Sequence, residues 1–419
     1  MSYRYDHRQL ADEMELFFFD EQIGAGLPVW LPSGVALREA LESYVNDLES
    51  EEGYVRVSSP HIAKSDLYHA SGHLQSFEGN MFPPMKRDDD LSEYHLKPMN
   101  CPHHHKVFSS SLRSYRDLPL RIAEYGQVYR FENSGSLRGL SRVRGLCQND
   151  GHIYIDPQDA EDEICRVLAL HERCYRDLGL KGYSYRLSLG DPQQPEQFHG
   201  SQELWRKSED ILENCLIKMN LKYSRSIGDA AFYGPKIDIQ MQMGIGDIAQ
   251  EESISSIQLD FNSGEKLNLN FIDQDGKKKI PWIIHRAPLG SHERFIAMLL
   301  EYYDGQLPGW LCPIQVCLVP MNEKNFSMAQ KIQKLLRYQG LRVLVDQKNG
   351  SLSKRIHFLH RLRPYAQVVL GDQELISEKI QVQLRGGEKW QGHFSELAHV
   401  LRQHLMIPGR SDLSLHESK

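Results

Sequence analysis

The chain has 419 residues, of which 25% are charged and 40% are hydrophobic, and its formal net charge is −7. That length allows two or three domains with at least one large core. No apolar run approaches the roughly 18 residues that a transmembrane helix needs, which argues against a membrane protein.

The N-terminal residues and the cysteines indicate the compartment. The opening MSYRYDHRQLADEMEL lacks the apolar core of a signal peptide and is too acidic for a typical transit peptide. The seven cysteines are scattered and have no CxxC spacing, which argues for a reducing compartment and against a disulfide framework. We therefore expect a cytoplasmic protein that does not contact a membrane.

Charge is distributed unevenly along the chain. From Cys312 to Lys419 there are 16 Lys and Arg against 9 Asp and Glu, whereas the preceding residues carry 33 against 47. A basic C-terminal region on an acidic body suggests contact with a polyanion, because neutralised phosphates release counterions. On charge alone, a solvated basic face is an equally good interpretation.

In chain order, LREALESYVNDLE (37–49) predicts an amphipathic helix with one apolar stripe, formed by Leu37, Leu41, Tyr44, Val45 and Leu48. The β-prone segment YVRVSSP (54–60) follows. KIDIQMQM (236–243) and KLNLNF (266–271) alternate apolar and polar residues, which predicts half-buried strands of an antiparallel sheet with one covered face. ERFIAMLLEYY (293–303) predicts a strongly apolar helix.

The pattern changes beyond LPGWLCP (307–313). Strands are predicted at IQVCLV, LRVLVD, AQVVL and IQVQL, and helices at FSMAQKIQKLLRYQG, SKRIHFLHRL and near 394–405. Alternating strands and helices describe a small α/β domain with a mostly parallel or mixed sheet. We place the domain boundary near residue 311, giving domains 1–310 and 311–419.

Three stretches of the first domain combine arginine, glycine and polar turns: YRFENSGSLRGLSRVRG (129–145), QNDGHIY (148–154) and HRAPLGSHERF (285–295). The first resembles motif 2 of class II aminoacyl-tRNA synthetases, and GSHERF resembles their motif 3. KPMNCP, RVRGLCQNDGHIY, AFYGPKIDI, IQLDF and IIHRAPLGS extend the resemblance to the threonyl-tRNA synthetase family over almost the whole chain. The resemblance implies an α+β fold, with a class II catalytic domain of antiparallel sheet flanked by helices and a C-terminal α/β anticodon-binding domain.

The run MNCPHHHKVF (99–108) places one cysteine and three histidines close together in sequence, which suggests a metal site within this one segment. The resemblance implies instead one Zn²⁺ held by Cys101, His152 and His285. Three protein ligands leave one position open, as catalytic zinc requires, and the family's substrate fills it with its amino and hydroxyl groups. We expect the three consecutive histidines 103–105 to lie behind the ligands or at the surface. From spacing alone, a buried cysteine and two packed histidines are the default.

The resemblance also implies a threonine-binding pocket, formed by Met99, Gln148, Asp150, Tyr233, Gln258 and Ser291. A hydrophobic pocket rejects valine only modestly, because valine is nearly isosteric with threonine, whereas a metal that demands a hydroxyl ligand rejects it better. Serine, which has the hydroxyl, should still bind. The residues alone leave two alternatives open, a turn cap for Asp150 and core packing for Tyr233.

For ATP, which Mg²⁺ should accompany, the resemblance assigns Arg130 to the α-phosphate, Glu132 to the adenine amine, Arg142 to the distal phosphates and Arg294 to adenine and the γ-phosphate. Arg130 and Arg294 are the expected catalytic arginines, because a permanent charge on a planar fork suits phosphate. Surface ion pairing is the alternative for these arginines. Leu146 stands where the family usually has a phenylalanine that stacks on adenine, which weakens the expected nucleotide contact.

Two further expectations concern tRNA. His73 matches a family histidine associated with transfer to the tRNA ribose, and an imidazole can take that hydroxyl proton, although a structural histidine is the alternative. Gln383 stands where the family usually has an anticodon-reading arginine. Arg385, Lys354 and Arg355 are candidates to compensate through backbone contacts, which position tRNA without reading its sequence.

These observations predict a threonyl-tRNA synthetase that activates L-threonine with ATP and transfers it to tRNA(Thr), as a homodimer paired through the 37–60 region. Because the chain begins directly at the catalytic domain, we expect it to form seryl-tRNA and not to clear it. One alternative is a paralogue that delivers threonine to a carrier protein or another nucleophile. A second is a non-catalytic tRNA-binding relative.

Overall fold

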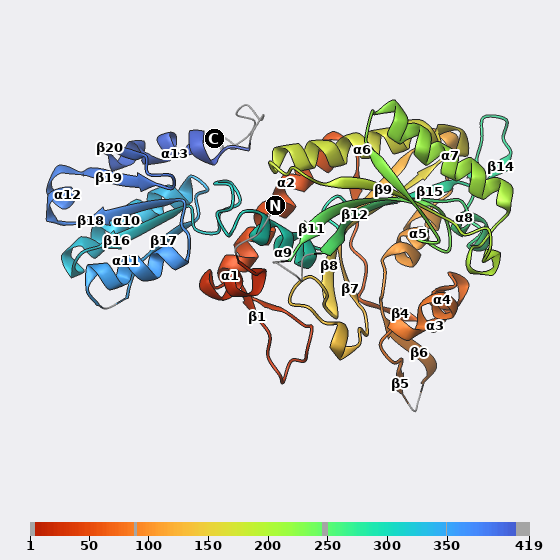
Figure 1. The fold of residues 1–419 in the computed structure, drawn as a ribbon, viewed down its shortest axis with the longest axis horizontal. Coiled ribbons are helices and arrows are strands. Elements are labelled where there is room, and N and C mark those ends of the chain that lie inside the picture. The colour runs from red at the N-terminus through yellow and green to blue at the C-terminus, as the bar shows by residue number, and fades with distance from the viewer. Residues whose placement is uncertain (1–4, 88–89, 245–249, 349, 408–419) are drawn as a thin grey trace. The chain divides into compact units, whose positions relative to one another are not determined.

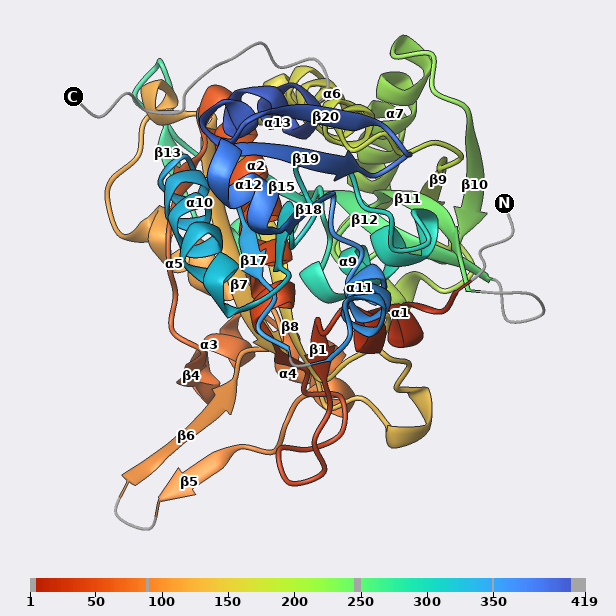
Figure 2. The ribbon, with the colours of Figure 1, turned by 90° about the vertical axis from the view of Figure 1, so that its left-hand side faces the viewer.

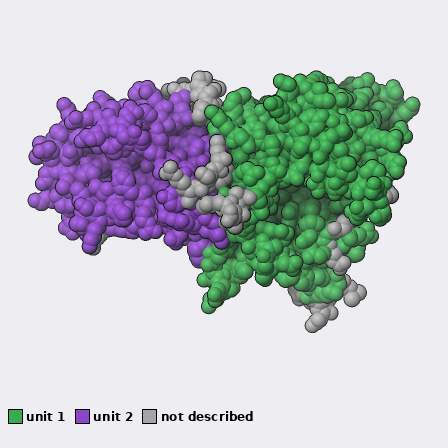
Figure 3. All heavy atoms as spheres, in the orientation of Figure 1, with its two compact units in different colours: residues 1–2, 19–28, 45–298 green, residues 3–18, 29–44, 299–419 purple. Residues whose placement is uncertain are grey.

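The computed structural model describes residues 5–87, 90–244, 250–348 and 350–407. The chain divides into two compact units (Figure 3). Unit 1 comprises residues 1–2, 19–28 and 45–298, and unit 2 comprises residues 3–18, 29–44 and 299–419. The end of the second predicted domain, 408–419, lies outside the described residues, and the boundary near residue 311 stays a prediction. No helix in the described ranges is long and apolar enough to cross a membrane.

Unit 1 is built on an eight-stranded sheet in the order β10-β9-β11-β12-β15-β8-β7-β3 (Figure 1). The strands are β3 (Val55–Arg56), β7 (Leu120–Tyr129), β8 (Gly145–Ile155), β9 (Ser184–Leu189), β10 (Tyr223–Ile227), β11 (Lys236–Met243), β12 (Gln250–Asp260) and β15 (Trp282–Arg286). The β3–β7 and β9–β10 pairs are parallel, and the other five pairs are antiparallel. The predicted antiparallel sheet with flanking helices is confirmed.

Helices cover both faces of this sheet. On one face lies α5 (Cys101–Ser109), whose Phe108 stacks on Tyr154 of β8 with ring centroids 4.3 Å apart. On the other lies α6 (Ala160–Asp177), where His171 Nδ1 is 3.0 Å from Ser255 Oγ of β12. Helix α7 (Gln202–Lys218) packs beside α6, and α9 (His292–Tyr302) follows β15. The candidate site lies on the α5 face.

The helix predicted at 37–49 lies within α2 (Pro32–Glu51), and all five residues of its predicted stripe are at most 2% exposed. The C-terminal turn of α2 carries Glu49, whose carboxylate is 2.7 Å from the Arg286 guanidinium of β15. Arg286 also lies over the ring of Tyr54 and crosses Gly151, where a Cβ would stand 2.5 Å from the guanidinium carbon. A buried ion pair therefore joins this part of α2 to the sheet.

Smaller elements of unit 1 surround the sheet. They are β4 (Ile62–Lys64), α3 (Ser65–Ala70), α4 (His73–Phe77), β5 (Met85–Arg87), β6 (Asp90–Leu96), α8 (Ser263–Lys266), β13 (Phe271–Ile272) and β14 (Lys278–Lys279). Strands β4, β6 and β5 form a separate three-stranded sheet that extends away from the larger one (Figures 1 and 2).

The strand predicted at 266–271 is wrong except at its last residue. The segment ends α8 and then passes through Asn268, whose φ is +51°, before β13 begins at Phe271. Leu269 and Phe271 are nevertheless buried, at 2% and 0% exposure. The alternation of apolar and polar residues at 266–271 therefore belongs to a loop whose apolar side chains pack into the core, and not to an extended strand.

The strand predicted at 236–243 matches β11 residue for residue, but it is not half-buried. Asp238 and Gln240 on its polar face are 3% and 1% exposed. Ser188 and Ser256 donate to Asp238 at 2.8 and 2.7 Å, and Gln240 donates to Ser253 at 2.6 Å. Hydrogen bonds from neighbouring strands let this polar face be covered.

Unit 2 contains a five-stranded sheet in the order β17-β16-β18-β19-β20. Its elements are α1 (His7–Glu13), β1 (Phe17–Phe18), β2 (Val29–Trp30), β16 (Val316–Pro320), α10 (Phe326–Tyr338), β17 (Val343–Val345), α11 (Leu352–Arg361), β18 (Ala366–Leu370), α12 (Asp372–Ser377), β19 (Lys379–Leu384), β20 (Lys389–His393) and α13 (Leu397–Leu405). The β16–β17 and β16–β18 pairs are parallel and the other two antiparallel, so the predicted mixed sheet is confirmed.

Strand β16 shows why this sheet is covered on both faces. Val316 and Leu318 belong to a core with residues of α10 and α13, whereas Cys317 and Val319 belong to a second core with Leu359 of α11. Successive side chains of a strand point to opposite faces, so a fully apolar strand needs helices on each side. Figure 2 shows α10, α11 and α13 around the sheet.

Candidate active site

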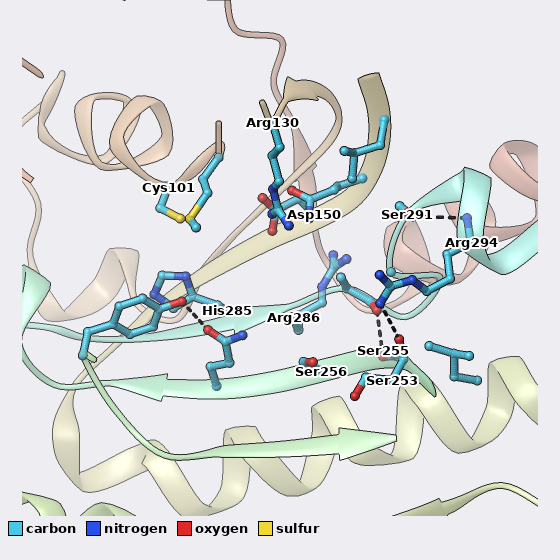
Figure 4. Close-up of a pocket in the computed structure, with 18 residues that line it drawn as sticks. Cys101, Arg130, Asp150, Ser253, Ser255, Ser256, His285, Arg286, Ser291 and Arg294 are labelled. Atoms are coloured by element: carbon cyan, nitrogen blue, oxygen red, sulfur yellow. Dashed lines mark hydrogen bonds between the residues drawn. The ribbon is translucent and has the colours of Figure 1, made fainter. Parts of the chain in front are cut away.

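A cavity of about 280 Å³ opens on the α5 face of the eight-stranded sheet (Figure 4). Eleven of the residues expected at the site line it: Met99, Cys101, Arg130, Leu146, Gln148, Asp150, Tyr233, Gln258, His285, Ser291 and Arg294. These residues come from six separate stretches of sequence. The sheet, rather than any one motif, brings them together.

Strand register explains the convergence. Leu146, Gln148, Asp150 and His152 alternate along β8 and therefore share one face. His285 of β15 pairs with His152, and Gln258 of β12 pairs with His285, so these three side chains form a row across adjacent strands. After β15, Gly290 takes φ +52° and its α-carbon approaches the Ile254 carbonyl closely, which turns the chain into α9.

The expected metal ligands form a compact buried group. One donor atom from each of Cys101, His152 and His285 lies within 4.8 Å of the other two. His152 Nε2 is buried and has no hydrogen-bond partner among the described residues. Burial raises the pKa of the Cys101 thiol and lowers that of His152. One sulfur and two imidazoles suit Zn²⁺, so the donor set fits the expected ion.

The three consecutive histidines are not at the surface, because all are buried on α5. His104 Nδ1 lies 2.7 Å from His152 Nδ1, directly behind the metal group. His105 Nδ1 lies 2.9 Å from the Tyr154 hydroxyl. The expectation of a place behind the ligands therefore holds for His104, and the expectation of a surface place is wrong for all three.

Asp150 projects into the cavity beside this group (Figure 4). Asn100 donates to its carboxylate at 2.9 Å. Gly126 makes room for that amide, because a Cβ at residue 126 would stand 2.3 Å from it. On the opposite wall the Tyr233 hydroxyl donates to the Gln258 amide oxygen, and the Tyr233 ring stacks on His285. A carboxylate, a hydroxyl and an amide thus surround one small space.

Of the three arginines that line the cavity, Arg286 pairs with Glu49, and Arg130 and Arg294 donate to backbone carbonyls. Arg294 Nη1 donates to the carbonyl oxygen of Ser253 at 3.0 Å (Figure 4). Arg294 Nε donates to the Ser141 carbonyl at 3.0 Å, and Arg130 Nε donates to the Pro98 carbonyl at 3.4 Å. Burial, followed by the charge of Arg294, lowers the pKa of Arg130, and burial lowers that of Arg294. Two guanidinium groups fixed in one partly desolvated cavity favour an anionic ligand.

Four expected residues are not among those that line the cavity: His152, which belongs to the metal group described above, and Glu132, Arg142 and His73. Glu132 and Arg142 form an ion pair with each other at 2.8 Å. His73 lies at the start of α4 beside Phe232, and its Nδ1 is 2.9 Å from Ser71 Oγ. Burial lowers the pKa of His73 to about 4, with smaller effects from His285 and Lys266.

Sequence reasoning missed several polar residues of the site: Ser253, Ser255, Ser256 and Arg286, which line the cavity, and Asn100, which donates to Asp150. Asn100 lies inside the KPMNCP motif, so its position was available as a signal. The serines give no signal of this kind, because they reach the cavity only through the pairing of β12 with β15.

In unit 2, Gln383 lines a cavity of about 490 Å³ together with Gln367, its register partner on β18. Arg355 and Arg385 both have internal hydrogen-bond partners, Arg385 also lines this cavity, and the tRNA backbone contacts expected of them stay predictions. Arg355 donates to Asp346 at 2.7 Å and to the Pro320 carbonyl at 2.8 Å, and Arg385 donates to the Leu307 carbonyl at 2.6 Å. Of the three compensating candidates, Lys354 is the exposed one.

Comparisons with known proteins agree with this geometry. The tRNA synthetase class II core domain (G, H, P, S and T) matches residues 84–303, and the anticodon binding domain matches residues 315–404. Threonine–tRNA ligases of Geobacillus sp. strain WCH70 and Geobacillus kaustophilus are 40% and 41% identical over 92% of this chain. The chain spans 59% and 58% of the length of these two relatives.

Solved structures show the same likeness. The RNA binding domain of threonyl-tRNA synthetase from Cryptosporidium parvum is 32% identical, with a TM-score of 0.88 over 97% of this chain and 99% of that chain. A putative threonyl-tRNA synthetase from Aeropyrum pernix is 28% identical, with a TM-score of 0.80 over 95% and 94%. Prolyl-tRNA synthetase from C. parvum, at 16% identity and a TM-score of 0.70 over 96% and 77%, shares the fold.

Proposed function

Because the chain belongs to the threonyl-tRNA synthetase family of class II enzymes, we propose that it activates L-threonine with ATP and transfers it to tRNA(Thr) in the cytoplasm. The observation that carries the proposal is one cavity whose wall holds two fixed arginines near a Cys–His–His group and the Asp150 carboxylate. No single stretch of sequence could supply both a polyphosphate site and a site for an amino acid with a hydroxyl group.

In the activation step, a carboxylate oxygen of threonine attacks the α-phosphorus of ATP, and the bond to pyrophosphate breaks. Arg130 is assigned to the α-phosphate and Arg294 to the adenine and the γ-phosphate, with Mg²⁺ accompanying the nucleotide. Their charges stabilise the negative charge that develops on phosphate oxygens, which is the main demand of phosphoryl and adenylyl transfer. Glu132 is assigned to the adenine amine and Arg142 to the distal phosphates, and both contacts start from the ion pair that these two residues form with each other.

Selection of threonine is assigned to the part of the cavity beside Cys101, His285 and Asp150. Cys101, His152 and His285 would hold Zn²⁺, which supplies a Lewis-acidic position for the amino and hydroxyl groups of the substrate. Asp150 accepts hydrogen bonds from the same amino group, whose N–H bonds remain available as donors, and the Tyr233–Gln258 pair forms another part of the cavity wall. Met99, Gln148, Leu146 and Ser291 complete the surface of the cavity.

The transfer step needs a group that accepts the proton of the tRNA ribose hydroxyl, and His73 is assigned to it. Ser71 Oγ donates to the Leu67 carbonyl at 2.9 Å, so it accepts from His73 Nδ1–H. This arrangement leaves a lone pair on His73 Nε2, which has no hydrogen-bond partner among the described residues. With a pKa lowered to about 4 by burial, His73 is neutral at physiological pH and can accept a proton.

Unit 2 is the proposed tRNA-binding part of the chain. Its cavity beside Gln383 is lined by three glutamines, Gln306, Gln367 and Gln383, whose amides can hydrogen-bond the edges of an unstacked base. Lys354, whose side chain is exposed, is proposed to contact a phosphate of the tRNA backbone. The homodimer expected through residues 37–60 stays part of the proposal.

Threonine-dependent exchange between ATP and labelled pyrophosphate tests the activation step on the full chain. We expect exchange with threonine, weak exchange with serine and little with valine, and its loss in Arg294→Ala. Absence of exchange in the folded, zinc-loaded protein would favour a non-catalytic relative. Charging of tRNA(Thr) then tests the transfer step, and exchange without charging would favour delivery of threonine to another nucleophile.

A further inference from the structure

Two buried side chains behind His152 take no part in the proposed chemistry. His104 of α5 and Glu124 of β7 are 0% and 4% exposed. His104 Nε2 lies 2.9 Å from Glu124 Oε2, and His104 Nδ1 lies 2.7 Å from His152 Nδ1. A carboxylate, an imidazole and a predicted metal ligand therefore form one continuous chain of hydrogen bonds.

The partners of Glu124 determine where the protons of this chain lie. The Ser59 backbone N–H donates to Oε1 at 2.8 Å, the Ser59 hydroxyl lies 2.9 Å from Oε2, and Lys97 Nζ donates to Oε1 at 3.4 Å. These donors mark the carboxylate as an ionised acceptor, so His104 Nε2 carries the hydrogen and donates to it. Only one hydrogen fits between His104 Nδ1 and His152 Nδ1, and the proposed metal site needs that hydrogen on His152 Nδ1.

This order of donors leaves His152 Nε2 with a lone pair and no hydrogen. Nε2 is the buried nitrogen that has no hydrogen-bond partner in the part of the chain that the structure describes. The other histidine of the group is also held through one ring nitrogen, because His285 Nε2 lies 3.0 Å from Asp260 Oδ2. Its Nδ1 is then the nitrogen left for the metal. Asp260 acts on His285 directly, whereas Glu124 reaches His152 only through the His104 ring.

We propose that His104 and Glu124 are positioning residues that hold His152 in the tautomer whose Nε2 binds the metal. The proposal rests on the proposed zinc site of Cys101, His152 and His285. Outer hydrogen-bond partners of this kind fix ligand orientation, and their loss typically weakens metal binding by about 10–100-fold. The middle histidine of the HHH run therefore supports a metal site that contains none of the three.

The run supplies its own matched control. His103 precedes His104 on α5 and is 8% exposed, and neither of its ring nitrogens has a hydrogen-bond partner among the described residues. His104→Leu removes the link and leaves His152 Nδ1 unpaired, whereas His103→Leu removes an imidazole of the same helix without touching the link. His104→Gln keeps one donor and one acceptor on the side chain and should recover part of the binding.

The experiment measures zinc affinity of the full chain by competition with a chromophoric chelator, with circular dichroism to verify folding. The d–d absorption of the Co²⁺-substituted protein provides a second readout of the ligand field. We expect wild type and His103→Leu to bind alike, His104→Leu to bind about 10–100-fold more weakly with an altered Co²⁺ spectrum, and His104→Gln to fall between them.

Equal affinity of His104→Leu and wild type, or an equal loss in His103→Leu, overturns the proposal while leaving the zinc site intact. A wild-type protein that binds no zinc overturns the proposed metal site as well, so the two failures are distinguishable. If His104→Leu does not fold, Glu124→Gln decides the matter, because it removes the negative charge and keeps the side-chain volume. Unchanged zinc affinity and an unchanged Co²⁺ spectrum in Glu124→Gln overturn the proposal.

Discussion

Leu146 forms an apolar part of the cavity wall where an aromatic residue is expected in this family. It is 7% exposed and packs with Val128 and Val143. A leucine can contact an adenine ring, but it has no aromatic face to stack on it. In the proposed ATP site, we therefore expect Leu146 to limit the strength of nucleotide binding without taking part in the chemistry.

We predict that Leu146→Phe lowers the KM for ATP by about 2–10-fold, since an aromatic stack is worth about 0.5–1.5 kcal/mol beyond its area. The KM for threonine should not change, because Leu146 is assigned to the adenine ring of ATP and not to the amino acid. Pyrophosphate exchange at varied ATP and varied threonine measures both. An unchanged or raised KM for ATP in a variant of normal thermal stability would contradict the predicted stacking.

For single residues, the sequence predicts which side chains belong to the candidate site better than it predicts what those side chains contact. The resemblance selects Cys101, His152 and His285, and the cavity geometry brings them together. The roles of Asn100 and His104 depend on partners about 50 positions away, Asp150 and His152. Those pairs follow from the packing of α5 on β8, which no local pattern encodes.

Among the elements, the end of α2 illustrates how a helix can be attached to a sheet by charge. Glu49 is 1% exposed and accepts from Asn149 at 3.0 Å and from Arg56 at 2.5 Å, besides pairing with Arg286. Arg286 is 1% exposed. Removing one member of such a pair leaves the other charge buried and uncompensated.

We predict that Glu49→Gln lowers the free energy of unfolding by about 3–5 kcal/mol, the usual loss when a buried pair is broken. Chemical denaturation followed by fluorescence measures it. The control is Glu51→Gln on the same helix, whose partner Arg173 lies at 2.6 Å in an exposed pair. Glu51→Gln should lower the free energy of unfolding by less than about 1 kcal/mol. Equal changes in the free energy of unfolding for the two substitutions would show that burial does not determine how much the Glu49–Arg286 pair stabilises the fold.

The elements also show where periodicity succeeds and fails as a predictor. The stripe of α2 and the strands of unit 2 follow the sequence closely, because burial on one face or on both faces repeats at a fixed period. KLNLNF alternates equally well, yet Asn268 takes a left-handed conformation that a strand does not contain. Polar residues of β11 look solvent-facing until the serines that satisfy them are known.

For the whole molecule, stability in acid depends on histidines that are buried in the neutral form. Burial lowers the pKa of His171 to about 3 and, as the first of several causes, the pKa of His103 and His73 to about 4. In the unfolded chain these groups have ordinary pKa values near 6.5. The unfolded state therefore binds more protons between about pH 6.5 and 3, and the folded state loses stability as the pH falls through that range.

His171 isolates this effect because it lies on α6, on the sheet face opposite the cavity. Ser255 Oγ donates to the Ala287 carbonyl at 2.7 Å, so it accepts from His171 Nδ1–H. His171→Asn keeps a donor near that position and removes the ionisable ring. Above about pH 7.5 the ring is neutral in both states, so the difference in unfolding free energy between variant and wild type should not vary with pH.

Below pH 6.5 we predict that this difference shifts in favour of the variant by up to about 1.4 kcal/mol per pH unit, or about 2 kcal/mol at pH 5. Denaturant titrations of both full-length proteins at a series of pH values measure it. Acid release of a bound metal affects both proteins and cancels in the difference. A difference that stays constant from pH 8 to pH 5 would mean that His171 gains its proton equally in the folded and unfolded chains, and acid sensitivity would then originate at other groups.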